Sequence, residues 1–387
     1  MVAALESTEL RAALAIPDDV LAVNAGTRGP MSNAAWSAMV WAQQQDRTVF
    51  GERPGYLDQY ERVHAADRAE VARLICCKAE DVALCESTTV GLNIVLWGCD
   101  LKPGDELLTT SLENAAAVVP LRVFAERRGV RLKCLQLGDG EIDLTEGVAG
   151  AITARTKVLL VSDVNCATGT RFDLSSIATI AHEHGILVLA DGVQAVGSCP
   201  VDVRALQVDA YALARHKFLC GPEGAGALYV SSAVRDRIHP TFTGVFSDAS
   251  HGGADRSDLY EDSRRYEIST RALAMSAGGA AGLRWMFDDV GWDWIFDVTA
   301  RRVAELRAAL AGLPGVQLLG SDAPGGGLVA FAVDGLDPDV VASRLTAHRV
   351  LCRSVFITRT PCVRLSVGFW SRESDADAIA RVLSTLI

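Results

Sequence analysis

Two residues, Asp191 and Lys217, have the chemistry and the spacing needed to hold a pyridine ring that bears an aldehyde. Asp191 follows an apolar run at 186–190, and Lys217 follows another at 210–213, so both are expected at the carboxyl ends of buried strands. A carboxylate at one strand end can pair with the ring nitrogen, and a lysine at a neighbouring strand end can carry the aldehyde as a Schiff base. The stretch 187–230 therefore predicts a site of this kind.

The setting of Asp191 strengthens this interpretation, because a carboxylate at the end of an apolar strand is costly to bury without a partner. A protonated ring nitrogen supplies that partner and makes the ring an electron sink. Gln194, three residues on, is placed to reach a phenolic oxygen of the ring. Burial and a neighbouring cation are expected to lower the pKa of Lys217, which suits a Schiff-base lysine. A surface lysine fits its Ala-Arg-His-Lys-Phe-Leu context less well.

A seat for an anion is predicted at Ser87-Thr88-Thr89, between an expected strand at 82–85 and an expected helix. Backbone N–H groups of a first helical turn point outward, the helix terminus carries partial positive charge, and the hydroxyls add donors. An ordinary helix cap made by Ser87 or Thr88 explains the same residues, and both interpretations stay open. The chain has no GxGxxG after an early strand and no GxxxxGK[ST], so a dinucleotide or nucleoside triphosphate is poorly supported.

Strands that alternate with helices must position these residues. The pattern predicts strands at 82–85, 106–110, 132–135, 158–162, 186–191 and 210–213, and one more after the glycine-rich turn at 220–226. Strands spaced by helices favour βαβ units, and therefore an α/β fold with a mostly parallel, seven-stranded sheet. The carboxyl ends of such a sheet form the edge that carries the site.

The pattern divides the chain into three parts. Residues 1–30 form an N-terminal segment whose glycine-rich loop at 23–31 is compatible with a connector or with part of the active-site wall. Residues 31–271 form a large domain that begins with helices at 33–49 and 57–75. Residues 272–387 form a small α+β domain, and the boundary near Ala272 falls inside a long helical region.

The composition argues against several classes of function. A net charge of −11 without a dense basic run argues against a nucleic-acid partner. No apolar stretch reaches the roughly 18 residues of a membrane span, and the acidic start lacks the features of a signal peptide. We therefore expect no membrane partner and a cytoplasmic location. The ten cysteines include no CxxC pair and no Cys/His ligand spacing, so no metal site is expected.

The segments DGVQAVG (191–197) and VDAYALARHKFLCGPEGAGALYV (208–230) closely resemble the class V branch of fold-type I enzymes, which use pyridoxal 5′-phosphate (PLP). The resemblance extends over about residues 20–387, and it is nearest to the group of cystine and cysteine-conjugate C–S lyases and cysteine desulfurases. It implies the fold-type I architecture, with a large PLP-binding domain and a small C-terminal domain.

The resemblance also assigns roles around the ring. It implies that Lys217 is the Schiff-base lysine, that Asp191 pairs with the pyridine nitrogen and that Gln194 contacts the phenolic oxygen. By the same resemblance, the further cofactor contacts are Thr88, Thr89, Asn114 and His216.

An amino-acid substrate and a shared active site are implied as well. Thr270 matches a threonine that reaches the phosphate of the other subunit, which implies a homodimer with the active site at the interface. Arg364, in CVRLSVGFW, matches the arginine that clamps the substrate α-carboxylate, a role that suits a planar two-pronged donor. A bulky substrate would lie against the loop from Asn24 and against Tyr56 of the same or the partner subunit.

Four departures from the desulfurase pattern bear on the reaction. Asn114 stands where a histidine usually stacks on the ring, and Cys166 stands where many relatives have asparagine. The usual SGHK is ARHK at 214–217, which loses one phosphate hydroxyl. The loop that carries the persulfide cysteine in desulfurases is expected at 353–358 and has no cysteine, while Cys362 is expected to be packed on the next strand.

Without that thiolate, desulfurase chemistry lacks its nucleophile. The resemblance therefore implies a PLP-dependent C–S β-lyase for an S-substituted L-cysteine, of the kind found in natural-product biosynthesis. In this reaction Lys217 takes the α-proton and the β-thiolate leaves, which gives thiol, pyruvate and ammonia. Decarboxylative oxidative deamination of an S-cysteine conjugate, epimerisation, transamination and desulfurase-like chemistry remain alternatives, and a non-catalytic PLP-fold protein is a remote one.

Overall fold

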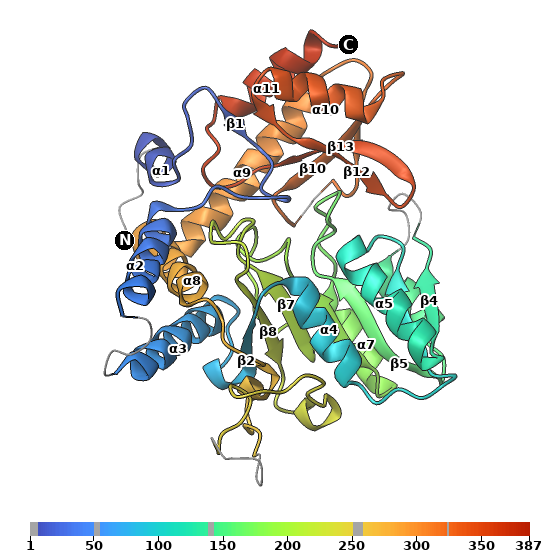
Figure 1. Ribbon diagram of the computed structural model, residues 1–387. Coiled ribbons are helices and arrows are strands. Elements are labelled where there is room, and N and C mark those ends of the chain that lie inside the picture. Colours follow the sequence, from blue (N-terminus) through green and yellow to red (C-terminus); the bar gives the residue numbers. More distant parts are fainter. Residues whose placement is uncertain (1–6, 50–54, 138–142, 251–257, 323–324) are drawn as a thin grey trace.

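The computed structural model describes residues 7–49, 55–137, 143–250, 258–322 and 325–387. A sheet of seven strands forms the base of the molecule, and a separate sheet of four strands, drawn in orange and red, lies above it (Figure 1). A short parallel pair joins β1 (Leu21–Ala22) to β11 (Val350–Leu351), so the N-terminal segment is tied to the small domain. The α/β class predicted from the sequence is confirmed.

The large sheet has the strand order β2-β8-β7-β6-β5-β3-β4. Its strands are β2 (Val82–Cys85), β3 (Glu106–Thr110), β4 (Arg131–Leu135), β5 (Thr156–Ser162), β6 (Leu187–Asp191), β7 (Ala210–Ala214) and β8 (Gly226–Val230). The five strands from β7 to β4 run parallel, and β8 is antiparallel to both of its neighbours. Strand β2 therefore runs in the same direction as the five, and the predicted mostly parallel sheet is confirmed.

Helices cover both faces of this sheet, and its central strands are therefore buried on both sides. On one face lie α4 (Thr88–Gly98) and α5 (Ala115–Arg128). On the other lie α6 (Leu144–Ala151) and α7 (Leu174–Glu183). Successive residues of one strand point to opposite faces, so each central strand contributes to two cores.

Further helices surround the sheet and lead to the small domain. The three that precede it are α1 (Ser7–Ala13), α2 (Asn33–Val49) and α3 (Tyr56–Leu74). Helix α8 (Leu273–Trp285) packs on α2 and α3, whereas α9 (Trp292–Ala311) packs on the small sheet, with a π-helical turn at Met286–Val290 between them. The domain boundary near Ala272 stays a prediction.

The stretch 236–270 has little regular structure where it is described. Two 3-10 turns, Arg235–Arg237 and Ser263–Tyr266, lie between β8 and α8, and a third at Ala79–Asp81 precedes β2. Residues 251–257 of this stretch lie outside the described residues.

The small domain is built on an antiparallel sheet of order β12-β13-β10-β9. Its remaining elements are β9 (Val316–Leu319), β10 (Leu328–Val333), β12 (Arg353–Ile357), β13 (Thr360–Ser366), α10 (Pro338–Ala347) and α11 (Asp375–Ser384). One face of the sheet packs against α9, α10 and α11. The other face turns toward the large domain, where Cys362 and Ile357 pack against Ala167 of the loop after β5.

The sequence predicted a loop at 353–358, and this prediction is wrong, because strand β12 occupies residues 353–357. This strand pairs residue by residue with β13, so that Arg353 lies opposite Arg364. Val355 packs toward the large domain, whereas the Ser354 hydroxyl donates a hydrogen bond to a carboxylate on α10. The alternation is typical of a strand, and the polar residues that open the segment obscure it in the sequence.

Candidate active site

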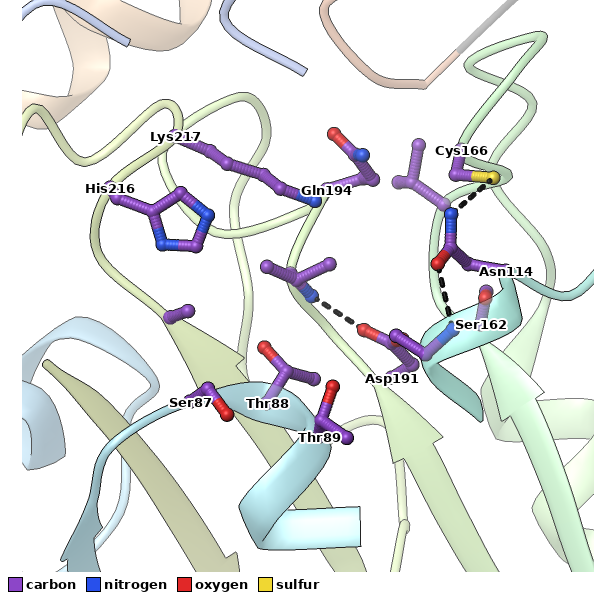
Figure 2. Close-up of a pocket in the computed structure, with 14 residues that line it drawn as sticks. Ser87, Thr88, Thr89, Asn114, Ser162, Cys166, Asp191, Gln194, His216 and Lys217 are labelled. Carbon is purple, nitrogen blue, oxygen red and sulfur yellow. Dashed lines mark hydrogen bonds between the residues drawn. The ribbon is translucent and has the colours of Figure 1, made fainter. Parts of the chain in front are cut away.

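The residues predicted to do chemistry meet at one edge of the large sheet. Strands β2, β3, β5, β6 and β7 end there, and the turns that follow them line a cavity of about 180 Å³ (Figure 2). Seven predicted site residues line it: Thr88, Thr89, Asn114, Asp191, Gln194, His216 and Lys217. The carboxyl ends of parallel strands leave such an edge free of crossing helices, which is why residues far apart in the chain converge on it.

Asp191 and Lys217 form the charged pair of this cavity. Asp191 ends β6 and is 4% exposed, and its Oδ1 accepts a hydrogen bond from Val193 N at 3.1 Å. Burial raises the pKa of Asp191, against the opposing effects of that N–H group and of Lys217. Burial likewise lowers the pKa of Lys217 to about 8, which Asp191 opposes and Arg364 reinforces. Lys217 thus gives up its proton far more readily than an exposed lysine.

The amino end of α4 forms the predicted anion seat. The Ser87 hydroxyl accepts a hydrogen bond from Val90 N at 3.2 Å, so Ser87 is the ordinary helix cap that the sequence left open. Thr88 follows it, and its Oγ1 is buried without a hydrogen-bond partner among the described residues. His216 faces the same space (Figure 2), and burial, followed by Lys217, lowers its pKa. An open helix terminus with an unused hydroxyl is suited to an anion.

Asn114 and Cys166 form one wall of the cavity (Figure 2). The Asn114 side chain caps α5 by accepting a hydrogen bond from Ala116 N at 2.9 Å, and its Nδ2 donates to Cys166 Sγ at 3.7 Å. Burial raises the pKa of Cys166, although the Asn114 hydrogen bond and the charge of Arg364 act in the opposite direction. The thiol form of Cys166 is therefore favoured near neutral pH.

A second acid, Glu113, lies close to Asp191. Ser162 Oγ donates a hydrogen bond to Glu113 Oε2 at 2.5 Å, and Thr110 Oγ1 donates to Oε1 at 2.7 Å. Ser162 lines the cavity and pairs with Asp191 across the β5–β6 register. Burial raises the pKa of Glu113 to about 7, the two hydroxyl donors oppose this shift, and Asp191 adds to it.

The N-terminal loop lies against the turn that carries Lys217. Gln194 Nε2 donates a hydrogen bond to Gly26 O at 3.0 Å, and Gln194 Oε1 is buried without a partner among the described residues. Gly29 N donates to His216 O at 2.8 Å. A Cβ at Gly29 would lie 1.9 Å from Lys217 O, so only glycine allows this approach.

Arg364 reaches the rim of the cavity from β13. It is 4% exposed, and its Nη1 donates to Cys166 O at 2.6 Å while its Nη2 donates to Thr27 Oγ1 at 2.7 Å. Its Nε is buried without a partner among the described residues. Burial lowers the pKa of Arg364 to about 10, which Cys166 opposes and Arg353 reinforces. Two hydrogen bonds thus hold the guanidinium group in place, and they leave its Nε–H and the second N–H of each terminal nitrogen for a ligand.

The other three predicted residues lie in different places. Asn24 lies beside the carboxyl end of β13, and its Oδ1 is buried without a partner among the described residues. Tyr56 begins α3, and its hydroxyl donates to Asp46 Oδ1 at 3.1 Å. Thr270 lines a second cavity of about 310 Å³. A single chain therefore does not bring Tyr56 or Thr270 to the main cavity, and their action across a subunit interface stays a prediction.

Some residues of the site received no role from the sequence: Thr27, Glu113, Ser162 and Arg353. Ser162 carried a usable signal, because it ends a predicted strand at the same edge as Asp191. Thr27 offered only a hydroxyl in a glycine-rich loop. Arg353 had no signal, since its segment was expected to be a loop rather than the strand that faces Arg364.

The fold and the site together match a known family. The sequence model for Aminotransferase class-V covers residues 56–378, which include the Asp191 and Lys217 turns and Arg364. The chain therefore belongs to the class V aminotransferase family.

Curated relatives of the chain include cysteine desulfurases. The chain is 31% identical over 288 residues to the cysteine desulfurase of Haloferax volcanii, which covers 71% of this chain and 65% of that protein. It is 29% identical over 343 residues to the cysteine desulfurase of Synechococcus elongatus, which covers 84% of this chain and 53% of that protein. The chain thus spans about half to two thirds of the length of these relatives.

Solved structures share the fold over nearly the whole chain. A lysine variant of C-DES with glycine covalently linked to its PLP cofactor matches with a TM-score of 0.91 and 25% identity, over 96% of this chain and 98% of that one. The complex of the cystine C–S lyase C-DES with its product cysteine persulfide has a TM-score of 0.89 and 25% identity, over 95% and 98%. The predicted fold-type I architecture is confirmed.

The sequence also led us to expect no membrane partner and no metal site. None of the helices in the described ranges is long and apolar enough to cross a bilayer. Within those ranges, no group of three His, Cys, Asp or Glu side chains is arranged to hold a metal ion.

Proposed function

We propose that the chain binds PLP in the main cavity and cleaves the C–S bond of an S-substituted L-cysteine, which yields a thiol, pyruvate and ammonia. Membership of the class V family, together with the PLP-bearing C-DES structure, supports the cofactor. The cysteine desulfurase and cystine C–S lyase activities named for the relatives support cleavage of a C–S bond in a cysteine-like substrate.

The described residues fit PLP because unused polar groups lie where its substituents would bind. The partnerless Thr88 hydroxyl at the amino end of α4 suits a phosphate. The Gln194 amide has a second N–H group besides the one used by Gly26, which suits a phenolic oxygen. Buried Asp191 suits a pyridinium nitrogen, and Lys217, with its lowered pKa, suits an aldehyde.

The chain's own residues would then carry out binding and proton transfer. When bound, PLP supplies an electron sink for negative charge at the substrate α-carbon. Arg364 binds the α-carboxylate, and its fixed hydrogen bonds to Cys166 O and Thr27 Oγ1 orient it for that role. Lys217 takes the α-proton, since a pKa of about 8 leaves a useful fraction of free amine near neutral pH.

The observation that carries the lyase assignment is the small-domain hairpin, 353–360, which contains no cysteine. The two cysteines that flank it, Cys352 and Cys362, are poor sources of a thiolate, because burial raises the pKa of each to about 11. A desulfurase needs a thiolate that attacks the substrate sulfur. Without one on this hairpin, elimination of the sulfur as a free thiol is the favoured outcome.

A cysteine desulfurase is the second candidate function, because Cys166 lines the cavity and the relatives carry that name. The two reactions give different three-carbon products. Transfer of sulfur to a protein thiol leaves alanine, whereas β-elimination leaves pyruvate and ammonia. The raised pKa of Cys166 keeps its thiolate scarce and favours the lyase.

We also propose a homodimer with the active site at the interface. Tyr56 and Thr270, both predicted to act in the site, lie away from the main cavity of their own chain. Large apolar side chains on α2 and α3 are exposed in the single chain: Trp36, Trp41 and Leu57. Such a surface is typical of one that another protein covers.

The experiment that tests the function supplies the PLP-loaded protein with S-substituted L-cysteines and identifies every product. We expect stoichiometric thiol, pyruvate and ammonia. Formation of alanine and a persulfide on the protein from unsubstituted L-cysteine, supplied in parallel, would assign the desulfurase reaction instead. Aldehyde, carbon dioxide and peroxide would assign oxidative decarboxylation and overturn the proposal.

A further inference from the structure

A third cation, Arg353, lies beside Arg364 at the rim of the site. Arg353 is the first residue of β12, and the register of the small sheet puts it directly opposite Arg364 of β13. Opposite residues in an antiparallel pair have their side chains on the same face, with Cβ atoms about 5 Å apart. The two arginines therefore project from one face of the sheet as near neighbours.

That face is the one turned toward the large domain. Side chains of a strand alternate, so Arg353 shares its face with Ile357, and Arg364 shares its face with Cys362. Ile357 and Cys362 both pack against Ala167, which follows the cavity-lining Cys166. Arg353 thus lies on the side of the small domain that covers the cavity wall.

The positive charge of Arg353 acts on the site and has no acidic partner in it. Burial is the main reason that the pKa values of Lys217 and Arg364 are lowered, and the Arg353 guanidinium lowers both further. Among the described residues Arg353 forms no ion pair, and its Nε donates to Ser354 O at 3.3 Å. Like charges directly opposite one another on a sheet are unfavourable. An anionic ligand would offset that cost.

We propose that the S-substituent of the substrate carries a second acidic group, which Arg353 binds. This inference rests on the proposed function, in which Arg364 binds the α-carboxylate and the amino end of α4 binds the cofactor phosphate. Neither anion is then available to Arg353. Because Arg353 and Arg364 are immediate cross-strand neighbours, the two acids of the substrate must be few bonds apart. S-(Carboxyalkyl)-L-cysteines are the matching class.

The test compares two substrates that differ in charge and hardly at all in size. S-(2-Carboxyethyl)-L-cysteine carries the second acid, and S-(2-carbamoylethyl)-L-cysteine carries an amide in its place. For the PLP-loaded parent we expect kcat/KM to be about 10- to 100-fold higher with the acid, the range of one charge-assisted hydrogen bond. In Arg353→Gln the ratio should fall to about one, with the value for the amide changed less than about threefold.

Arg359→Gln is the matched control, because Arg359 is an exposed arginine in the turn of the same hairpin. It should keep the preference of the parent for the acid. Arg353→Gln should unfold at the same temperature as the parent or above it, since a like-charge contact is removed. Equal kcat/KM for both substrates in the parent, or an unchanged ratio in Arg353→Gln, would overturn the inference.

A binding measurement separates this inference from the proposed function. If neither compound releases thiol and pyruvate, the lyase proposal fails. The change in cofactor absorbance on titration still gives a dissociation constant for each compound. Tighter binding of the acid that is lost in Arg353→Gln would uphold the second subsite, and equal binding would refute it.

Discussion

The floor of the cavity and its rim are assembled in different ways. The floor consists of turns at the ends of strands in one sheet, and hydrogen-bonded register fixes their relative positions, as where Ser162 lies beside Asp191. The rim joins segments from three parts of the chain, and side-chain hydrogen bonds rather than strand register hold its arginine in place. Thr27 of the N-terminal loop and Cys166 of the large domain meet Arg364 of the small domain through two hydrogen bonds.

This difference separates the residues that suit the cofactor from the residues that bear on the type of reaction. The floor carries the groups that suit PLP, and its geometry follows from the sheet alone. The rim and wall carry the features that distinguish the chain from a desulfurase, namely Asn114, Cys166 and the cysteine-free strand β12. Changes in the floor should therefore abolish cofactor-dependent chemistry, whereas changes at the rim should alter substrate choice and product.

The largest effect is expected from the floor residue Lys217. Lys217→Ala should lower kcat about 10⁴-fold, because general base catalysis of the α-proton transfer is lost. The rate of pyruvate formation measures it. Lys102→Ala, an exposed lysine on a loop, is the control and should leave the rate unchanged. A residual rate within tenfold of the parent would show that Lys217 is not the base.

A smaller loss is expected from the rim residue Arg364. Arg364→Lys keeps the charge but not the two-pronged donor, so kcat/KM should fall about 10- to 100-fold, mainly through KM. Steady-state kinetics with an S-alkyl-L-cysteine check this split. Arg359→Lys on the same hairpin should behave as the parent. A fall in kcat alone would contradict a role in carboxylate binding.

The floor also predicts a pH dependence of stability. Burial raises the pKa of Glu113 to about 7, so the folded protein holds a proton that the unfolded chain releases between about pH 4.5 and 7. Stability from this group is present below that window and is lost as the pH rises through it. The cofactor-free parent should lose on the order of 2 kcal/mol more than Glu113→Gln across the window. Urea unfolding at several pH values measures this difference, with the exposed Glu61→Gln as control; parallel curves for the parent and Glu113→Gln would refute it.

The smallest effect is expected at Cys166 on the wall. Cys166→Ser should change the rate of pyruvate formation by less than about threefold, because the lyase reaction uses no protein thiol. Product analysis of the variant checks this. If Cys166 instead accepts the substrate sulfur, the substitution would abolish sulfur transfer, and the parent would form alanine.

The sequence predicted the floor well because chain order and strand ends determine it. Alternating apolar runs placed six strands of the large sheet within two residues of their observed bounds and located the seventh after the glycine-rich turn, and parallel strands bring their carboxyl ends together. Asp191, Lys217 and Thr88 could be identified on that basis, and only the choice between cap and anion seat needed the structure. In the structure Ser87 caps α4, and the Thr88 hydroxyl has no hydrogen-bond partner among the described residues.

The rim was harder to predict because its contacts join remote parts of the chain. Thr27 and Arg364 are 337 positions apart, and nothing in their local sequence indicates that they meet. The strand β12 was missed because a five-residue edge strand with two polar residues has a weak period-two pattern. Its register then brought Arg353 beside Arg364, which no sequence pattern indicated.

The central claim is that the floor holds PLP on Lys217. Borohydride reduction of the PLP-loaded protein, followed by proteolysis and mass spectrometry, tests it directly. The account predicts a pyridoxyl phosphate mass on the peptide that contains Lys217 and on none of the other four lysines, Lys78, Lys102, Lys133 and Lys157. An unmodified Lys217, or the mass on another lysine, would contradict the account.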